Sequence, residues 1–104
     1  MKNLESASFD TEIQNGYVMV DFSASWCPDC RFIEPMLEAL DKEFEQVRFY
    51  KVGFDTELSL KDRFNIRKIP TLMFFKNGEE VGERLIEPRS IESIRDMLNT
   101  LIKA

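Results

Sequence analysis

The sequence contains no histidine, and this absence removes more chemistry than any other feature of its composition. Imidazole is the usual general base at neutral pH, the group that orients a serine or cysteine nucleophile, and a frequent metal ligand. Mechanisms that depend on it are therefore excluded. Cysteine is also scarce, because Cys27 and Cys30 are the only two copies. With so few ligands available, we expect no metal site within the chain.

Long apolar runs are missing as well. The first residues carry an acid and lack the apolar core of a secretory signal, and no stretch approaches the length of a membrane span. Lys and Arg number 14 against 19 Asp and Glu, which gives a net charge of −5. A protein that binds nucleic acid usually has a surface rich in Lys and Arg instead. We therefore expect a cytoplasmic protein that binds neither nucleic acid nor membrane.

The apolar residues that are present amount to 43% of the chain, which is enough for one packed core. Residues 1–104 are the length of one ordinary domain, and no internal repeat or linker divides them. We therefore expect a single domain.

Hydrophobic periodicity predicts alternating helices and strands. The predicted helices are a short one around residues 9–13, then 28–44, 57–64, and a last one that begins after Ser90. The predicted strands are residues 17–22, 47–54, 71–75 and 81–86, with a hairpin turn at 76–79 and a further edge strand near Leu4. This order predicts an α/β fold with a central mixed sheet of four to five strands and helices on both faces.

The two cysteines fall where the strand 17–22 gives way to the helix 28–44. Unpaired backbone N–H groups and the positive end of the helix dipole stabilise negative charge on a sulfur at Cys27. A thiolate is the species that attacks a disulfide. Cys30 follows one turn deeper, where we expect it to be less exposed and able to displace a substrate bound at Cys27. The spacing indicates a reversible redox couple.

Several further motifs accompany the cysteine pair. They are Ser8-Phe9-Asp10, Val20-Asp21-Phe22, Ala24, Trp26 before Cys27, Pro35, Lys51, Asp55, Ile69-Pro70-Thr71 and Phe75-Lys76-Asn77-Gly78. In this combination the chain resembles the thioredoxin family over nearly its whole length. The resemblance implies a thioredoxin fold and an enzyme that catalyses thiol–disulfide exchange, in which reduced Cys27 and Cys30 reduce disulfides of proteins or small molecules.

The resemblance also implies roles for individual residues. Cys27 matches the attacking cysteine and Cys30 the resolving cysteine. Asp21 matches a buried aspartate that takes a proton from Cys30, and burial in an apolar strand raises the pKa of a carboxyl group. Lys51 matches a lysine that modulates the charge of that aspartate. Four catalytic residues are therefore expected.

On the substrate side, Pro70 matches a cis proline beside the cysteines, and the Ile69 backbone would pair with an incoming extended segment. Trp26 would form a wall of the groove. The expected substrate-contacting residues are Trp26, Pro28, Asp29, Ile69, Pro70 and Thr71.

The family also implies partners. No cofactor is expected to bind the chain, whose redox-active group is the Cys27–Cys30 disulfide. NADPH would contribute only indirectly, through a flavoprotein of the thioredoxin-reductase type, and a low-molecular-weight thiol is the alternative electron donor. Disulfide-containing proteins are the expected substrates, and a monomer is expected.

Three positions depart from the family pattern. Pro28-Asp29 replaces the usual Gly-Pro between the cysteines, and an acid there opposes thiolate formation. Arg31 is the residue we expect to offset this charge. Ser23 stands where the family usually has tryptophan, and a glycine near the last strand is replaced within Glu87-Pro88. These changes indicate a specialised member of the family.

Other interpretations of the pair remain. The couple could operate at a higher potential, as an oxidant or isomerase. The chain could instead be a binding module that uses the groove without redox chemistry. Two thiols are also half of a zinc site, which a dimer would complete.

Overall fold

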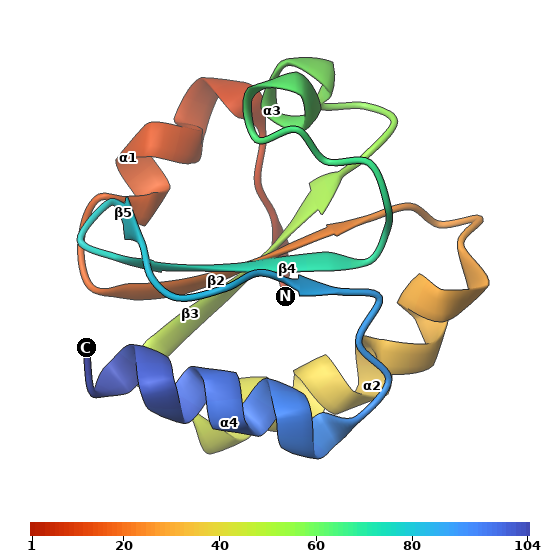
Figure 1. Cartoon of the computed structure of the whole chain (residues 1–104). Helices are drawn as coiled ribbons and strands as arrows, with labels where there is room; N and C mark the ends of the chain where they lie inside the picture. The colour runs from red at the N-terminus through yellow and green to blue at the C-terminus, as the bar shows by residue number, and fades with distance from the viewer.

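The computed structural model describes residues 1–104, and a mixed β-sheet runs through its centre (Figure 1). The strands are β1 (Lys2–Asn3), β2 (Tyr17–Ser23), β3 (Val47–Gly53), β4 (Thr71–Lys76), β5 (Glu79–Glu80) and β6 (Leu85–Ile86). They lie in the order β1-β3-β2-β4-β5. β6 is not in this row, because it pairs directly with β4. β3 is parallel to β1 and β2, whereas β4 is antiparallel to β2, β5 and β6. The predicted mixed sheet is confirmed, with six strands in place of four to five.

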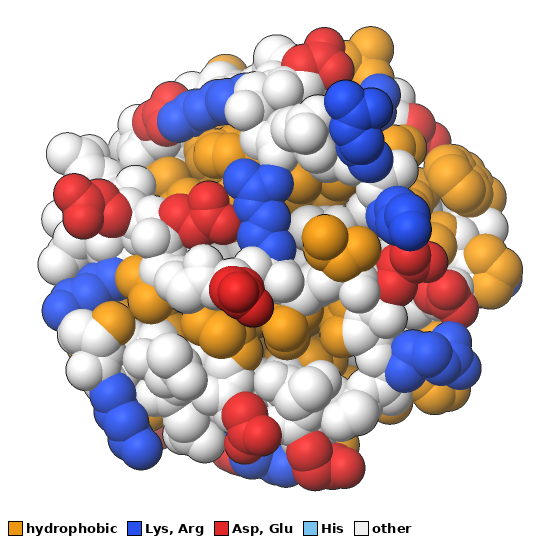
Figure 2. Space-filling view, viewed as in Figure 1, with side chains coloured by type: hydrophobic (Ala, Val, Ile, Leu, Met, Phe, Trp, Pro, Cys, Tyr) orange, Lys and Arg blue, Asp and Glu red, His pale blue; other side chains and the backbone are white.

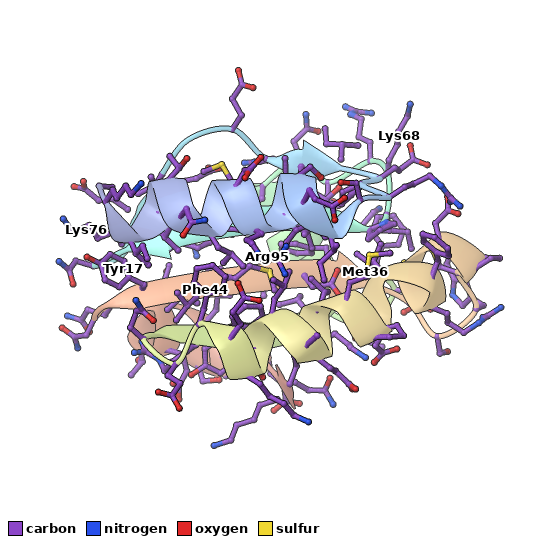
Figure 3. The ribbon with its side chains drawn as sticks, turned by 90° about the horizontal axis from the view of Figure 1, so that it is seen from below. Tyr17, Met36, Phe44, Lys68, Lys76 and Arg95 are labelled. Atoms are coloured by element: carbon purple, nitrogen blue, oxygen red, sulfur yellow. The ribbon has the colours of Figure 1, made fainter.

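Helices cover both faces of this sheet, as predicted. A short 3-10 turn η1 (Ser6–Ser8) precedes α1 (Phe9–Ile13), and α2 (Pro28–Glu43), α3 (Leu58–Arg63) and α4 (Ile91–Ile102) follow. α1 and α3 lie on one face, and α2 and α4 lie side by side on the other (Figures 1 and 3). An ion pair of 2.8 Å between Arg95 and Glu43 joins these last two helices. None of the four is long and apolar enough to cross a membrane.

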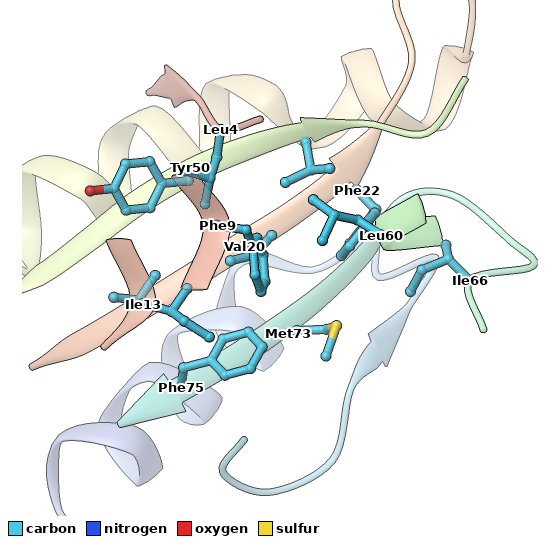
Figure 4. Close-up of a cluster of buried hydrophobic side chains, with 12 residues drawn as sticks. Leu4, Phe9, Ile13, Val20, Phe22, Tyr50, Leu60, Ile66, Met73 and Phe75 are labelled. Atoms are coloured by element: carbon cyan, nitrogen blue, oxygen red, sulfur yellow. The ribbon is translucent and has the colours of Figure 1, made fainter. Parts of the chain in front are cut away.

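Side chains on β2 alternate between two cores. Val18, Val20 and Phe22 point into the core beneath α1 and α3, where they meet aromatic rings such as Phe75 (Figure 4). Met19 points to the opposite core, beneath α2 and α4. Because successive strand residues face opposite sides, Asp21 shares the α2 face with Met19. The alternation therefore places a carboxyl group beneath the start of α2.

The start of α2 is fixed by its first residues. Pro28 occupies the first turn, where the lack of an N–H costs no hydrogen bond. Cys27 is the N-cap, and its sulfur accepts a hydrogen bond from the backbone N–H of Cys30 at 3.2 Å. A buried stripe, formed by Cys30, Ile33, Leu37 and Leu40, holds the helix against the sheet. The functional motif is thus anchored by the packing of the helix that it begins.

The predicted strand 81–86 is wrong in its middle. β5 pairs with β4, and the Val81 N–H after β5 still donates to the Phe74 carbonyl at 2.8 Å. Strand pairing with β4 then stops and resumes only at β6. Gly82 lies between them with φ of +68°, a left-handed conformation that interrupts a ladder. The interruption explains why the sheet has more strands than expected.

Alanine at Gly82 is expected to destabilise the fold by about 1–2 kcal/mol, because an L-residue is strained at this φ. Steric overlap adds little, since the Cβ would lie 2.5 Å from Cε of Met97, the mobile end of a flexible side chain. Urea unfolding measures the change. Gly82→Asn is the matched control and should cost less, because asparagine tolerates the left-handed region. Equal costs for the two variants would contradict backbone strain as the cause.

Candidate active site

Cys27 lies at the N-terminus of α2 with its sulfur held in a polar cradle. The sulfur accepts the Cys30 N–H, and the Cys27 thiol donates to the Ile69 carbonyl at 3.8 Å. The positive end of the α2 dipole lies at the same position. The structure therefore places the Cys27 sulfur at a helix N-terminus, the position that the sequence predicted.

Cys30 is held in a different environment. Burial, followed by its hydrogen bond with Cys27, raises the pKa of the Cys30 thiol well above that of an ordinary cysteine. The thiol therefore keeps its proton at neutral pH and needs a base to release it. The expectation that Cys30 is less exposed than Cys27 is wrong, since each residue is 5% exposed. Ala24 packs with the two cysteines in one buried cluster, and Ile69 packs against that cluster.

Trp26 stands beside the cysteines and is 59% exposed, which is unusual for so large an apolar side chain. Its indole N–H donates to Asp55 Oδ2 at 2.9 Å, which fixes the orientation of the ring. The side chain is therefore not core filler. It offers an exposed apolar surface at the residue that precedes Cys27.

The turn at Ile69–Pro70, just before β4, also packs against the cysteines. The Ile69–Pro70 bond is cis, and Ile69 contacts the cysteine cluster. Thr71 is only 3% exposed, and its hydroxyl donates to the Lys68 carbonyl. It shapes the turn rather than offering a free hydroxyl. Glu87 N–H donates to the Pro70 carbonyl at 2.8 Å from the loop before α4.

Glu87 adopts φ of +52°, a left-handed conformation that favours glycine. The resemblance to the family implied a replaced glycine within Glu87-Pro88, and Glu87 is the one of these two residues with a left-handed φ. The strained backbone is held by its hydrogen bond to the turn.

The charge of Asp29 is offset by a residue that the sequence did not indicate. Arg31 was the expected partner, but its guanidinium donates to the Ser25 carbonyl at 2.8 Å. Arg89 instead pairs with Asp29 at 3.0 Å, and its guanidinium lies 4.3 Å from the ring centroid of Phe32. The expectation for Arg31 is therefore wrong, because its side chain turns back to close the loop before α2. Both members of the Asp29–Arg89 pair are largely exposed, so the pair shapes the surface more than it stabilises the fold.

Asp21 is buried beneath the cysteines and is 2% exposed. One of its oxygens, Oδ1, has no hydrogen-bond partner. Burial raises its pKa from 3.8 to about 7, the charge of Lys51 opposes this increase, and Glu34 adds to it. Asp21 and Cys30 line the same cavity of about 430 Å³. The carboxyl group can therefore exchange a proton near neutral pH next to the thiol that needs a base.

Lys51 lies directly beside Asp21, because the two residues are register partners on β3 and β2. Its ammonium nevertheless pairs with Glu34 Oε1 of α2 at 2.5 Å. Sequence reasoning placed Lys51 near Asp21 but missed Glu34. The signal was present, since Glu34 follows Cys30 by four residues and must share its helix face. Arg89 had no comparable local signal.

No three side chains among the His, Cys, Asp and Glu residues are gathered as a metal would require. The site joins a cysteine sulfur at a helix N-terminus, a protonated second thiol, and a buried carboxyl group of raised pKa. Together these groups can break and form disulfides while a proton moves between Cys30 and Asp21.

Comparisons with known proteins agree with this chemistry. A family model described as Thioredoxin matches residues 1–100. The thioredoxin of Chlamydia pneumoniae is 35% identical over 99 residues, which cover 95% of this chain and 96% of that protein. Thioredoxin-1 of Saccharomyces cerevisiae is 38% identical over 79 residues, or 75% of this chain and 77% of its own.

Solved structures show the same fold. A structure of Plasmodium falciparum thioredoxin superposes with a TM-score of 0.88 at 30% identity, covering 96% of this chain and 98% of that one. Mitochondrial thioredoxin 3 of Saccharomyces cerevisiae shares the fold with a TM-score of 0.89. The family works through its cysteine pair, without a bound cofactor, on disulfide-containing proteins, and a reductase restores the pair. The chain belongs to the thioredoxin family and is a thiol–disulfide oxidoreductase with a Cys-x-x-Cys active-site pair.

Proposed function

We propose that the chain acts as a reductant of protein disulfides, with Cys27 as nucleophile, Cys30 as resolving thiol and Asp21 as the proton acceptor of Cys30. The observation that carries this proposal is the position of the Cys27 sulfur as N-cap of α2, with Cys30 behind it and the Asp21 cavity beyond. The groups follow one another in the order in which the reaction needs them.

In the first step, the Cys27 thiolate attacks one sulfur of the substrate disulfide. The substrate S–S bond breaks, a mixed disulfide forms at Cys27, and the first substrate sulfur leaves as a thiolate that takes a proton from water. In the second step, the Cys30 thiol gives its proton to the Asp21 carboxylate and attacks the Cys27 sulfur. The second substrate thiolate leaves, and the chain is left with a Cys27–Cys30 disulfide. Two electrons have passed to the substrate.

Substrate would lie in the groove between the Trp26 ring and the turn at Ile69–Pro70. The exposed indole gives an apolar contact, and the backbone of Ile69 offers hydrogen-bonding groups to an extended segment. Pro28 and Asp29 directly follow Cys27 in the first turn of α2 and would contact the same segment of substrate. Acidic and basic side chains are interspersed on the face seen in Figure 2, with no broad field of one sign. Such a surface fits protein substrates better than nucleic acid.

Electrons would come from a flavoprotein reductase that uses NADPH, or from a low-molecular-weight thiol. The cytoplasm fits this role, because that compartment keeps thiols reduced. The Asp29–Arg89 pair stands beside the attacking sulfur, where partners must dock. A reductase or substrate would therefore have to accommodate this pair.

The reduction potential of the Cys27–Cys30 couple tests the direction of electron flow. For a reductant we expect a value near −270 mV, against about −180 mV for an isomerase and about −120 mV for a strong oxidant. Equilibration in dithiol buffers is followed by the fluorescence of Trp26, the only tryptophan of the chain. The double variant Cys27→Ser/Cys30→Ser supplies the baseline. A value near either of the higher potentials would contradict the reductant and favour oxidation or isomerisation.

A further inference from the structure

The ammonium group of Lys51 forms its ion pair with Glu34 and not with Asp21, the buried acid on the neighbouring strand. Lys51 and Asp21 are register partners on neighbouring parallel strands, so their side chains leave the same face of the sheet. An ion pair between them would satisfy the Asp21 oxygen that lacks a partner. Lys51 instead lies 2.5 Å from Glu34 Oε1, on the first half of α2. Glu34 therefore competes with Asp21 for this cation.

The cavity that these residues share runs from solvent to Asp21. Asp21 lies at its buried end with 2% exposure, whereas the side chains of Lys51 and Glu34 are 29% and 38% exposed. The other charged or titratable groups on its walls are Cys30 and Arg31 of α2 and Asp55 of the loop after β3. Arg31 is hydrogen bonded to the Ser25 carbonyl, and Asp55 to the Trp26 indole. Lys51 is thus the cation whose position can change the charge balance at Asp21.

We propose that Glu34 is a positioning residue for the redox reaction, because it holds the Lys51 ammonium away from Asp21 and so sets how readily Asp21 exchanges a proton with Cys30. With Lys51 held by Glu34, the Asp21 carboxylate lacks a strong partner and is a better base. If Lys51 is released, it can pair with Asp21 and stabilise the carboxylate, which then accepts a proton less readily. The inference rests on the proposed role of Asp21.

Glu34→Gln tests this inference with the reduced protein. The midpoint of the Asp21 carboxyl titration, followed by carbon-13 NMR of its side chain, should fall by about one pH unit, because Lys51 is free to approach. The acid limb of the rate of mixed-disulfide resolution, measured in single turnovers, should move by the same amount. Glu38→Gln is the matched control, since Glu38 lies one turn further along the same helix and is exposed. An unchanged midpoint in Glu34→Gln would overturn the inference.

A double-mutant cycle with Lys51→Met separates positioning from the direct charge of Glu34. The Asp21 midpoint should rise in Lys51→Met, and Glu34→Gln should then add only a small shift. Equal shifts from Glu34→Gln in both backgrounds would mean that Glu34 acts directly, which overturns the inference. The titration of Asp21 does not depend on the redox reaction, so it tests the positioning separately from the proposed function. A midpoint that moves while the rate profile does not would support the positioning and contradict the role of Asp21 in the proposed function.

Discussion

Serine in place of Cys27 is expected to lower the rate of disulfide reduction more than about a thousandfold. The Cys27 sulfur lies at the N-terminus of α2 and accepts the Cys30 N–H at 3.2 Å. A hydroxyl at the same place stays protonated at neutral pH, so the helix terminus has no anion to stabilise. Stopped-flow reduction of a protein disulfide by the reduced chain measures the rate.

Cys30→Ser is the matched variant, because it keeps the nucleophile and removes only the resolving thiol. It should attack a substrate once and remain bound as a mixed disulfide, visible by mass spectrometry of the intact complex. The same comparison tests the binding-module interpretation. In that interpretation, the Cys27→Ser chain would still bind its partners fully, and the Cys30→Ser chain would trap no mixed disulfide. That pair of results would show that the chain binds partners without using the redox couple.

Asparagine at Asp21 is expected to stabilise the fold at pH 8 by up to about 4 kcal/mol. The pKa of Asp21 rises from 3.8 to about 7 on folding, and each pH unit corresponds to about 1.36 kcal/mol. A raised folded pKa means that the folded state holds the proton more tightly than the unfolded state. Stability is therefore lost as pH increases from about 4 to about 7, and the loss is complete above that range. Asparagine carries no charge at any of these pH values, so the Asp21→Asn variant avoids this loss of stability.

Urea unfolding at several pH values measures this effect. The difference between Asp21→Asn and the unchanged chain should disappear near pH 4 and reach its maximum above pH 7. Asp62→Asn is the control, since Asp62 is exposed on α3 and should show little dependence of this kind. The stabilised variant should also resolve mixed disulfides more slowly, because Cys30 has lost its proton acceptor. A difference between the chains that is independent of pH would contradict the raised pKa.

The parts of the site that the sequence predicted depend on local pattern. An acid within the apolar run of β2 predicted a buried carboxyl, and Asp21 is buried. A strand followed by Cys27-Pro28 predicted a helix N-terminus at the thiol, and α2 begins there. In each case, the neighbouring residues alone determine where the side chain points.

The parts that it did not predict depend on tertiary distance. Arg89 meets Asp29 across 60 residues of sequence, and no local pattern distinguishes it from Arg31. The break at Gly82 follows from a left-handed backbone with φ of +68°, which a strand pattern does not specify. Glu34 is intermediate, because its helix face was predictable from its spacing to Cys30 but its choice of Lys51 was not.

The loop between β6 and α4 contacts both sides of the active-site groove. Through Glu87 it contacts the turn at Pro70, and through Arg89 it contacts Asp29 in the first turn of α2. Only Pro88 separates the two attachments. The separation between the turn and the helix is therefore coupled to the length of one short loop. Inserting or deleting a residue there would shift both walls together, so the width of the groove can evolve through this loop while the cysteines keep their places.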